Sequence, residues 1–224
     1  MVNSSDMRFF QANFGRARLQ HYLDECQGDI GRVMHLYQWN TELSAAFWES
    51  LGHLEVALRN AIDQQMSARH LGKGRPGHWI YDDARELGRG RGKGTAKHAY
   101  PYADIDTAIK RVRKNKMPTD PGQIISEISF GFWHQMVSKG QMALWPDLAG
   151  AFPYMNGRSQ RTVADKVESL RALRNRIGHH HRIWSIDVAT KYAQLVALAG
   201  YISPQLASWI DDRSRVRALL ARRP

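Results

Sequence analysis

One uninterrupted apolar stripe in the first third of the chain restricts the fold more than any other feature of the sequence. Its members recur at three- and four-residue intervals for about seven helical turns, and they are Leu36, Leu43, Phe47, Leu51, Leu54, Leu58 and Ile62. This spacing places the side chains on one face of an α-helix, whereas a half-buried strand needs two-residue alternation, which is scarce in this chain. The stripe therefore predicts a long core helix that Asp29 caps and that Gly72, Gly74 and Pro76 end.

Apolar residues with the same spacing predict further helices along the chain. We expect them at residues 16–26, 104–114, 122–139, 159–177, 186–201 and 204–222. An aromatic run at residues 130–133, with Trp145 and Trp184, favours core packing over stacking on nucleic-acid bases. The length of 224 residues allows one generous domain or two small ones. Since the pattern indicates no sheet, we predict one all-α helical bundle over residues 1–224.

The chain is strongly basic, and this favours a polyanionic partner. It contains 32 Lys and Arg residues against 21 Asp and Glu residues, which gives a formal net charge of +11 and a pI near 10.0. Nucleic acid is the commonest such partner, because each phosphate that a protein neutralises releases condensed counterions. A basic protein whose charge serves only solubility remains the alternative.

The sequence indicates neither membrane insertion nor secretion. The mean hydropathy is −0.51, and the longest apolar stretch, at residues 193–202, is too short to cross a bilayer. The first ten residues lack the basic and apolar regions of a secretory signal. The single cysteine, Cys26, cannot form an internal disulfide, which fits a reducing compartment. We therefore expect a cytoplasmic protein without a membrane partner.

Much of the positive charge is concentrated in one segment. Residues 72–102 are rich in Gly, Pro and basic residues, which predicts a flexible loop inserted in the bundle. The loop does not fit the phosphate-loop template, so it is either a solvated insertion or a nonspecific contact for phosphates. The candidate RNA-binding residues in this loop and the following helix are Arg89, Arg91, Lys93, Lys110, Arg111, Arg113 and Lys114.

Residues 173–181 combine an arginine, an amide and three histidines within about two helical turns. On an uninterrupted helix the side chains of Arg174 and His179 would point about 140° apart. Gly178 offers a solution, because glycine is the favoured left-handed residue at a helix end. We therefore expect the helix to stop at Gly178 and the chain to reverse there, so that His179 swings back over Arg174.

The same five-residue separation occurs twice in this segment. Arg176 and His181 repeat the spacing of the first pair, but we favour the frame of Arg174 because a polar residue, Asn175, follows it. His180 and His181 are then supporting residues or RNA contacts. The alternative is that both are ordinary exposed residues of a turn.

Three consecutive histidines also allow a zinc or nickel site. Adjacent side chains rarely point in the same direction, and no carboxylate lies within the four residues before the triplet. The only cysteine lies far away in the sequence. We therefore expect no metal site and no cofactor.

An arginine and imidazoles provide the chemistry that RNA cleavage without a metal requires. One group must take the proton of the 2′-hydroxyl, a second must protonate the 5′ leaving oxygen, and a third must stabilise the charge on the phosphorane. Imidazole titrates near neutral pH, and a guanidinium binds two phosphate oxygens at once. One His179 cannot be both base and acid, so we expect a symmetric dimer to supply the second imidazole.

The long helix carries a second sequence of the same type. Arg59 and Asn60 follow a leucine, as Arg174 and Asn175 do, and Glu55 stands upstream of them. Five residues after Arg59 stands a glutamine instead of a histidine, so this copy lacks a proton carrier. We interpret Glu55, Arg59 and Asn60 as support for the site from a facing helix. The alternative is a surface ion pair of Glu55 with Arg59 that has no role in cleavage.

Three groups of segments carry a resemblance to a known family. They are residues 173–184 with the arginine, asparagine and histidines, residues 39–43 leading into 54–60, and the aromatic segment 128–133. With these segments the chain resembles the Abi-like (abortive infection) proteins of bacteria, which belong to the HEPN superfamily of all-α nucleases. The resemblance implies a HEPN-type bundle whose active motif is an arginine, four intervening residues and a histidine.

The resemblance also implies a function. It suggests a metal-independent endoribonuclease with Arg174 and His179 as the catalytic pair and Asn175 as the polar residue that follows the arginine. The site would be completed by homodimerisation, and the protein would act as a toxin in antiphage defence, restrained by a cognate antitoxin that is a protein or a noncoding RNA. A catalytically inactive RNA-binding module that acts by sequestration is the main alternative, and a dimerising scaffold is another.

Overall fold

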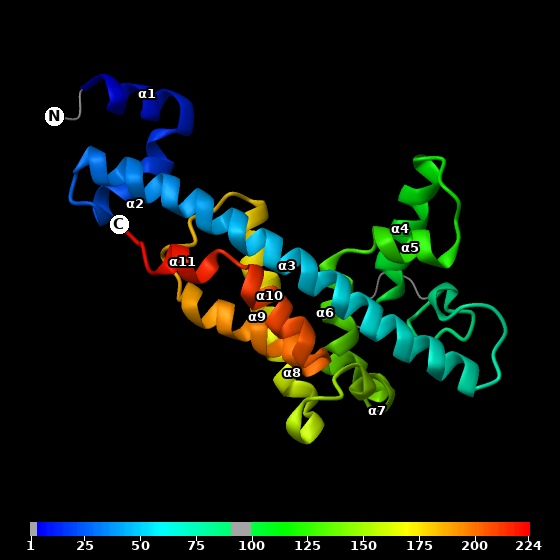
Figure 1. The fold of residues 1–224 in the computed structure, drawn as a ribbon. Coiled ribbons are helices and arrows are strands. Elements are labelled where there is room, and N and C mark those ends of the chain that lie inside the picture. Colours follow the sequence, from blue (N-terminus) through cyan, green and yellow to red (C-terminus); the bar gives the residue numbers. More distant parts are fainter. Residues whose placement is uncertain (1–3, 91–99) are drawn as a thin grey trace.

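The computed structural model describes residues 4–90 and 100–224, and in these ranges it consists of helices and loops without a β-strand (Figure 1). The predicted all-α fold is therefore confirmed. The α-helices are α1 (Ser4–Phe14), α2 (Arg16–Glu25), α3 (Ile30–Gly72), α4 (Tyr102–Lys114), α5 (Pro121–Glu127), α6 (Phe130–Val137), α7 (Trp145–Leu148), α8 (Gln160–Gly178), α9 (Val188–Ile202), α10 (Pro204–Arg213) and α11 (Val216–Leu220). Short 3-10 helices are η1 (Trp79–Tyr81), η2 (Lys139–Leu144), η3 (Ala149–Ala151) and η4 (Asn156–Arg158). None of the described helices is both long and apolar enough to cross a membrane.

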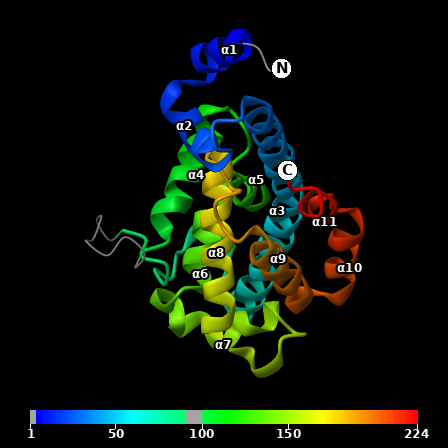
Figure 2. The same ribbon diagram turned by 90° about the vertical axis from the view of Figure 1, so that its left-hand side faces the viewer.

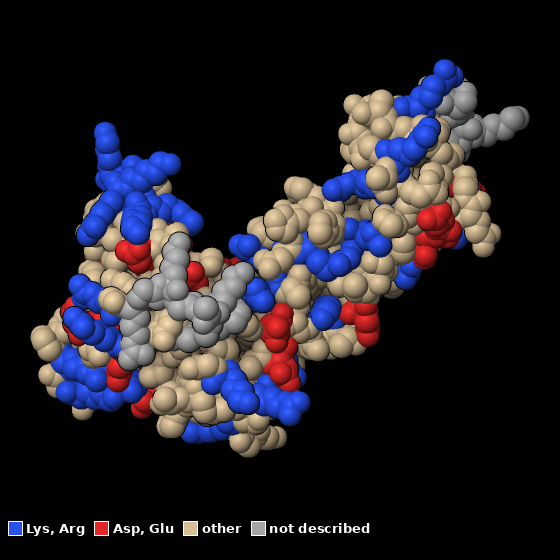
Figure 3. Space-filling view, turned by 180° about the vertical axis from the view of Figure 1, so that it is seen from behind, with Lys and Arg blue, Asp and Glu red and all other residues tan. Residues whose placement is uncertain are grey.

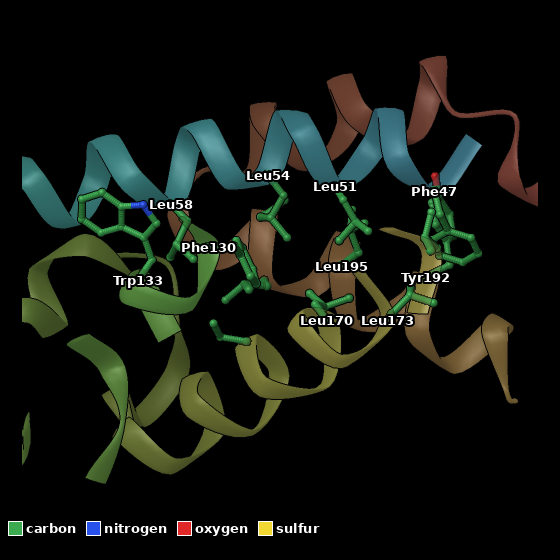
Figure 4. Packing of buried hydrophobic residues seen from close by; sticks show 14 of the residues in the cluster. Phe47, Leu51, Leu54, Leu58, Phe130, Trp133, Leu170, Leu173, Tyr192 and Leu195 are labelled. Atoms are coloured by element: carbon green, nitrogen blue, oxygen red, sulfur yellow. The ribbon is translucent and has the colours of Figure 1, made fainter. Parts of the chain in front are cut away.

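The longest helix, α3, forms the axis of the bundle. The carboxylate of Asp29 caps it by accepting a hydrogen bond of 3.1 Å from the N–H of Arg32. The helix then runs for 43 residues to Gly72, as the apolar stripe predicted. All residues of the stripe are buried, and Figure 4 shows several of them pointing toward side chains of α6, α8 and α9. Each leucine removed from water in this way contributes about 1.5–3 kcal/mol to stability.

The remaining helices are distributed along α3. Helices α1 and α2 lie beside its beginning, and α4 and α5 lie near its end (Figure 1). Seen from the end that carries α1, helix α8 passes between α4 on one side and α10 on the other (Figure 2). The C-terminal end of α8 thereby comes close to α2 and to the first half of α3.

The helix predicted over residues 122–139 is two helices, so this boundary was wrong. Extended backbone at Ile128 and Ser129 separates α5 from α6. The apolar block continues across this break, because residues on both sides of it are buried in the same core. The break lets α6 turn its aromatic side chains onto α3 and α8.

The helix predicted over residues 204–222 is also broken. Ser214 adopts an extended conformation after α10, and its hydroxyl accepts a hydrogen bond of 3.3 Å from the N–H of Val216 at the start of α11. The same hydroxyl lies 3.0 Å from the hydroxyl of Ser50 on α3. Serine side chains compete in this way with the hydrogen bonds of a helix backbone.

The described part of the predicted basic insertion, residues 73–90, is a loop with several side chains that contact the end of α3. The carboxylate of Glu86 accepts hydrogen bonds from Arg69, Lys73 and Arg75, with the shortest distance of 2.7 Å to Arg75. The buried carboxylate of Asp82 accepts a hydrogen bond of 2.9 Å from the N–H of Leu87. These contacts hold residues 73–90 on the end of α3.

Candidate functional site

The histidine triplet lies in the turn that ends α8, and this turn differs from the predicted one. Gly178 is the last residue of the helix, and the left-handed residue is His180, with φ of 54°. The N–H of His180 donates to the carbonyl of Ile177 at 2.9 Å, and that of His181 donates to Arg176 at 2.8 Å. These are the two hydrogen bonds of a Schellman motif. The expectation that the helix stops in a left-handed Gly178 is therefore wrong.

Because Gly178 remains helical, the bend does not swing His179 over Arg174. His179 caps α8 and is exposed, and the centre of its ring lies 5.9 Å from that of His181. Arg174 lies on the other side of the helix, with its guanidinium carbon 5.1 Å from the ring centre of Trp48 on α3. Because the backbone stays helical up to the cap, helix geometry sets the two side chains about 140° apart.

Arg174 instead lies among side chains of α3. Its positive charge and that of Arg59 act on the half-buried carboxyl of Glu55. Burial raises the pKa of Glu55 above its ordinary value, and the two arginines oppose this rise. The Nε atoms of Arg59 and Arg174 are buried and make no hydrogen bond within the described residues. Of the predicted supporting residues on α3, Glu55 and Arg59 thus lie near Arg174.

The predicted asparagines lie apart from this cluster of charges. Asn60 and Asn175 are both exposed. The carbonyl of Asn175 accepts a hydrogen bond of 3.0 Å from the N–H of His179, so its backbone is part of the helix end. Neither side chain makes a hydrogen bond within the described residues.

A surface cavity of about 640 Å³ lies between α2, α3 and the histidine turn, and we name it the aromatic cavity. Tyr22, Tyr37 and Trp48 form its aromatic walls, and His180 and His181 also line it. Trp48 is 45% exposed and contacts Arg174 as well, so it connects the arginine with the cavity. The histidines that reach the cavity are therefore the second and third of the triplet.

A model of the family described as Abi-like protein matches residues 2–185. The chain belongs to this family. The predicted resemblance to the Abi-like proteins is thus confirmed, and the membership indicates a role in abortive infection. The match includes α1 to α8 and the histidine turn, whereas α9, α10 and α11 lie beyond it. No curated protein and no solved structure matches the chain.

Two residues that the sequence reasoning missed hold the histidine turn of this Abi-like protein in place. The buried Oδ1 of Asn40 on α3 accepts hydrogen bonds from the N–H groups of Ile183 at 2.8 Å and Trp184 at 3.3 Å. Arg18 on α2 donates to the carbonyl of His180 at 2.8 Å. The available signal for Asn40 was a polar residue at helical spacing within an apolar stripe.

In the second possible pair of this Abi-like protein, Arg176 with His181, the arginine has a structural contact. Arg176 donates a hydrogen bond of 2.7 Å to the carbonyl of Arg182, across the loop that follows the histidines. Its guanidinium is thereby tied to the backbone of its own turn. This contact distinguishes Arg176 from Arg174, which makes no hydrogen bond to the described part of the chain.

The predicted RNA-binding residues of α4 form an exposed basic surface. Lys110, Arg111, Arg113 and Lys114 are all exposed, and Figure 3 shows the Lys and Arg side chains that gather at this projecting end, at the upper left. Lys110 pairs with Asp106 at 2.5 Å, and Arg111 pairs with a carboxylate of α5.

The other predicted RNA-binding residues lie in the segment before α4. Arg89 is exposed and forms an ion pair with Asp83. Arg91 and Lys93 lie outside the described residues. Within the described ranges, no group of three or more His, Cys, Asp or Glu side chains is arranged to hold a metal ion.

Proposed function

We propose that this Abi-like protein is a metal-independent endoribonuclease of the HEPN type that acts as a toxin in abortive infection. The observation that carries the proposal is the position of Arg174. Its guanidinium lies on Trp48 at the edge of the aromatic cavity, whose lining includes His180 and His181. A half-buried arginine with unused N–H donors, beside a cavity that two imidazoles line, is suited to hold a phosphodiester during proton transfer.

The chemistry assigns a role to each group. Arg174 binds two nonbridging oxygens of the scissile phosphate, and its contact with Trp48 fixes the plane of the guanidinium. One imidazole takes the proton of the 2′-hydroxyl while the 2′-oxygen attacks phosphorus. The bond from phosphorus to the 5′-oxygen breaks, and an imidazolium gives this oxygen its proton. The products are a 2′,3′-cyclic phosphate and a 5′-hydroxyl.

Two copies of the chain are needed to assemble these groups. Within one copy His179 points away from Arg174, but it is exposed and accessible to a second copy. A two-fold axis that places His179 of each copy over Arg174 of the other forms two equivalent sites, and in each site His180 or His181 of the aromatic cavity supplies the second imidazole. Trp48 and Val56, which are 45% and 46% exposed on the same helix, offer apolar surface for such a contact.

The surrounding charges support substrate binding and the site itself. Glu55 and Arg59 set the electrostatic environment of Arg174, as the pKa of Glu55 indicates. The exposed cations of α4 bind phosphates further along the RNA. Restraint by a cognate antitoxin, a protein or a noncoding RNA, follows from the proposed role as a toxin.

The proposal is tested by incubating purified protein with RNA in the presence of EDTA and then mapping the ends of the RNA products. Wild-type protein is expected to form 2′,3′-cyclic phosphate ends, and Arg174→Ala and His179→Ala each lose activity on the order of 100-fold or more. His35→Ala removes an exposed histidine at a distance from the turn and is the matched control. Binding of RNA without cleavage by the wild type would instead identify a module that acts by sequestration.

Mixing the two inactive variants tests the composite site. Half of the dimers that form at random are mixed, and each mixed dimer holds one site with both Arg174 and His179 intact. Activity is then expected to return to about one quarter of the wild-type value. If each site used both residues from the same copy, mixing would restore no activity.

A further inference from the structure

A second cavity adjoins the aromatic cavity on the other side of the histidine turn, and we name it the basic cavity. It has a volume of about 390 Å³ and lies between α2 and the loop that follows α8. Its lining contains arginines and histidines but no carboxylate, and consists of Ala17, Arg18, His21, Tyr22, Arg176, His180, His181 and Arg182. A concave surface with this composition favours an anionic ligand.

The arginines of the basic cavity carry charge that no ion pair compensates within residues 4–90 and 100–224. Arg18 and Arg176 each donate to a backbone carbonyl, at 2.8 and 2.7 Å, and the guanidinium carbon of Arg182 lies 5.9 Å from the ring centre of Trp184. Within the described residues none of the three arginines forms an ion pair with a carboxylate. The arginines around Glu86 differ in this respect, because both form ion pairs with that carboxylate.

Guanidinium groups of this kind match a phosphate. Each arginine that already donates one hydrogen bond to a carbonyl retains further N–H donors, and a planar fork binds two phosphate oxygens at once. The Nε of Arg176 is buried and makes no hydrogen bond within the described part of the chain. The backbone contacts hold the guanidiniums in place, so that little side-chain entropy is lost on binding.

The aromatic cavity provides a complementary surface for a base. The two cavities share Arg18, Tyr22, His180 and His181, so a ligand can extend from one into the other. Tyr37 and other aromatic residues line the aromatic cavity, and base stacking on such side chains contributes on the order of 1–3 kcal/mol. Its volume of about 640 Å³ lies in the range of small-molecule sites.

We propose that the two cavities together bind one nucleotide of the RNA strand, with its base in the aromatic cavity and its phosphate in the basic cavity. The assignment to RNA rests on the proposed function, whereas the match to a base and a phosphate rests on the cavities alone. Trp48 lines the aromatic cavity and also supports Arg174. The nucleotide in this subsite is therefore a neighbour of the scissile phosphate, and its base is a determinant of cleavage specificity.

Binding measurements on the full chain test this proposal without requiring cleavage. The probes are a 2′-O-methyl hexanucleotide, which has no 2′-hydroxyl to attack, the four nucleoside 5′-monophosphates, a nucleoside and inorganic phosphate. Isothermal titration calorimetry is expected to show that a monophosphate binds at least tenfold more tightly than phosphate or nucleoside alone, and that the hexanucleotide binds more tightly still. Equal affinities for phosphate and monophosphates would overturn the assignment of a base.

Substitutions in each cavity test whether the measured binding occurs at this subsite. Arg182→Ala is expected to weaken binding of the hexanucleotide about tenfold and to lower its salt dependence by about one ion. Arg182→Lys retains the charge and recovers part of the affinity. Tyr37→Leu weakens monophosphates but not inorganic phosphate. Arg161→Ala, which removes one exposed charge near the beginning of α8, far along the helix from the histidine turn, is the matched control.

The outcomes separate this proposal from the proposed function. His179 is not in the lining of either cavity, so a His179→Ala protein that no longer cleaves is expected still to bind the nucleoside monophosphates. Binding by a wild type that never cleaves RNA would refute the nuclease and leave the subsite standing. Tight binding of a monophosphate but not of the hexanucleotide would assign the cavities to a free nucleotide and overturn the assignment to RNA. Binding that neither Arg182→Ala nor Tyr37→Leu changes, in variants with wild-type unfolding curves, would overturn the subsite.

Discussion

Two substitutions test which residue at the end of α8 is left-handed. Their effects on the free energy of unfolding differ according to whether that residue is His180, as in the structure, or Gly178, as the sequence predicted. In the structure His180 has φ of 54°, whereas Gly178 is helical. A residue with a Cβ in the left-handed region costs about 1–2 kcal/mol relative to glycine. His180→Gly is therefore expected to raise the free energy of unfolding by about 1 kcal/mol, because the hydrogen bonds at this position use the N–H and carbonyl of His180 and not its side chain.

Gly178→Ala is expected to stabilise the protein as well. A Cβ at this position would lie 3.8 Å from the ring of Trp48, which is an ordinary van der Waals contact. Alanine is favoured over glycine inside a helix by about 0.5–1 kcal/mol. For a chain of this length each substitution should raise the melting temperature by about 2–4 °C per kcal/mol.

Urea unfolding followed by circular dichroism measures both variants. If Gly178 were the left-handed residue, Gly178→Ala would lower the stability by about 1 kcal/mol or more, and His180→Gly would not raise it. A destabilised Gly178→Ala protein would thus refute the geometry that separates Arg174 from His179. Since His180 lines both cavities, its effect on RNA cleavage is measured separately from stability.

Three further predictions concern other parts of the molecule. Asn40→Ala leaves two backbone N–H groups without their acceptor and is expected to lower the unfolding free energy by about 2–3 kcal/mol. Asn40→Asp keeps an acceptor and is the comparison. Urea unfolding of both variants measures the difference. The hydrogen bond with Arg75 lowers the pKa of Glu86 to about 2. The ionised carboxylate therefore stabilises the folded protein fully above the ordinary pKa of 4.5, and this contribution is lost as the pH falls toward 2. Glu86→Gln should flatten this part of the profile of unfolding free energy against pH. Arg113→Ala and Lys114→Ala remove exposed cations and should each lower the salt dependence of RNA binding by about one ion, and an unchanged salt slope would remove α4 from the interface.

Much of the fold was predictable because it depends on local patterns. The boundaries of α3 follow from a cap at Asp29, an apolar stripe and glycines at its end, and each of these signals lies within the helix or next to it. The breaks at Ser129 and Ser214 were not predicted, because the apolar pattern continues across both. The hydroxyl of Ser214 bonds to α3 and to the next helix, and such contacts exist only once the chain is folded.

The site was less predictable because its geometry depends on packing between distant segments. The rule that glycine ends helices placed the turn two residues too early, and histidine, which tolerates the left-handed region better than most residues, took that position. The cluster of Glu55, Arg59 and Arg174 was anticipated from repeated residues in two helices. The two cavities were not, because their walls come from α2, α3 and the loop after α8.

The length of α3 has a consequence for how the molecule unfolds. Its 43 residues form one hydrogen-bonded rod about 64 Å long, and α2, α6, α7, α8, α9 and α11 all contact it. Neither end of this rod can fray far without exposing apolar side chains that the neighbouring helices cover. Amide hydrogens along its whole length are therefore expected to exchange with solvent only through global opening, as one cooperative unit.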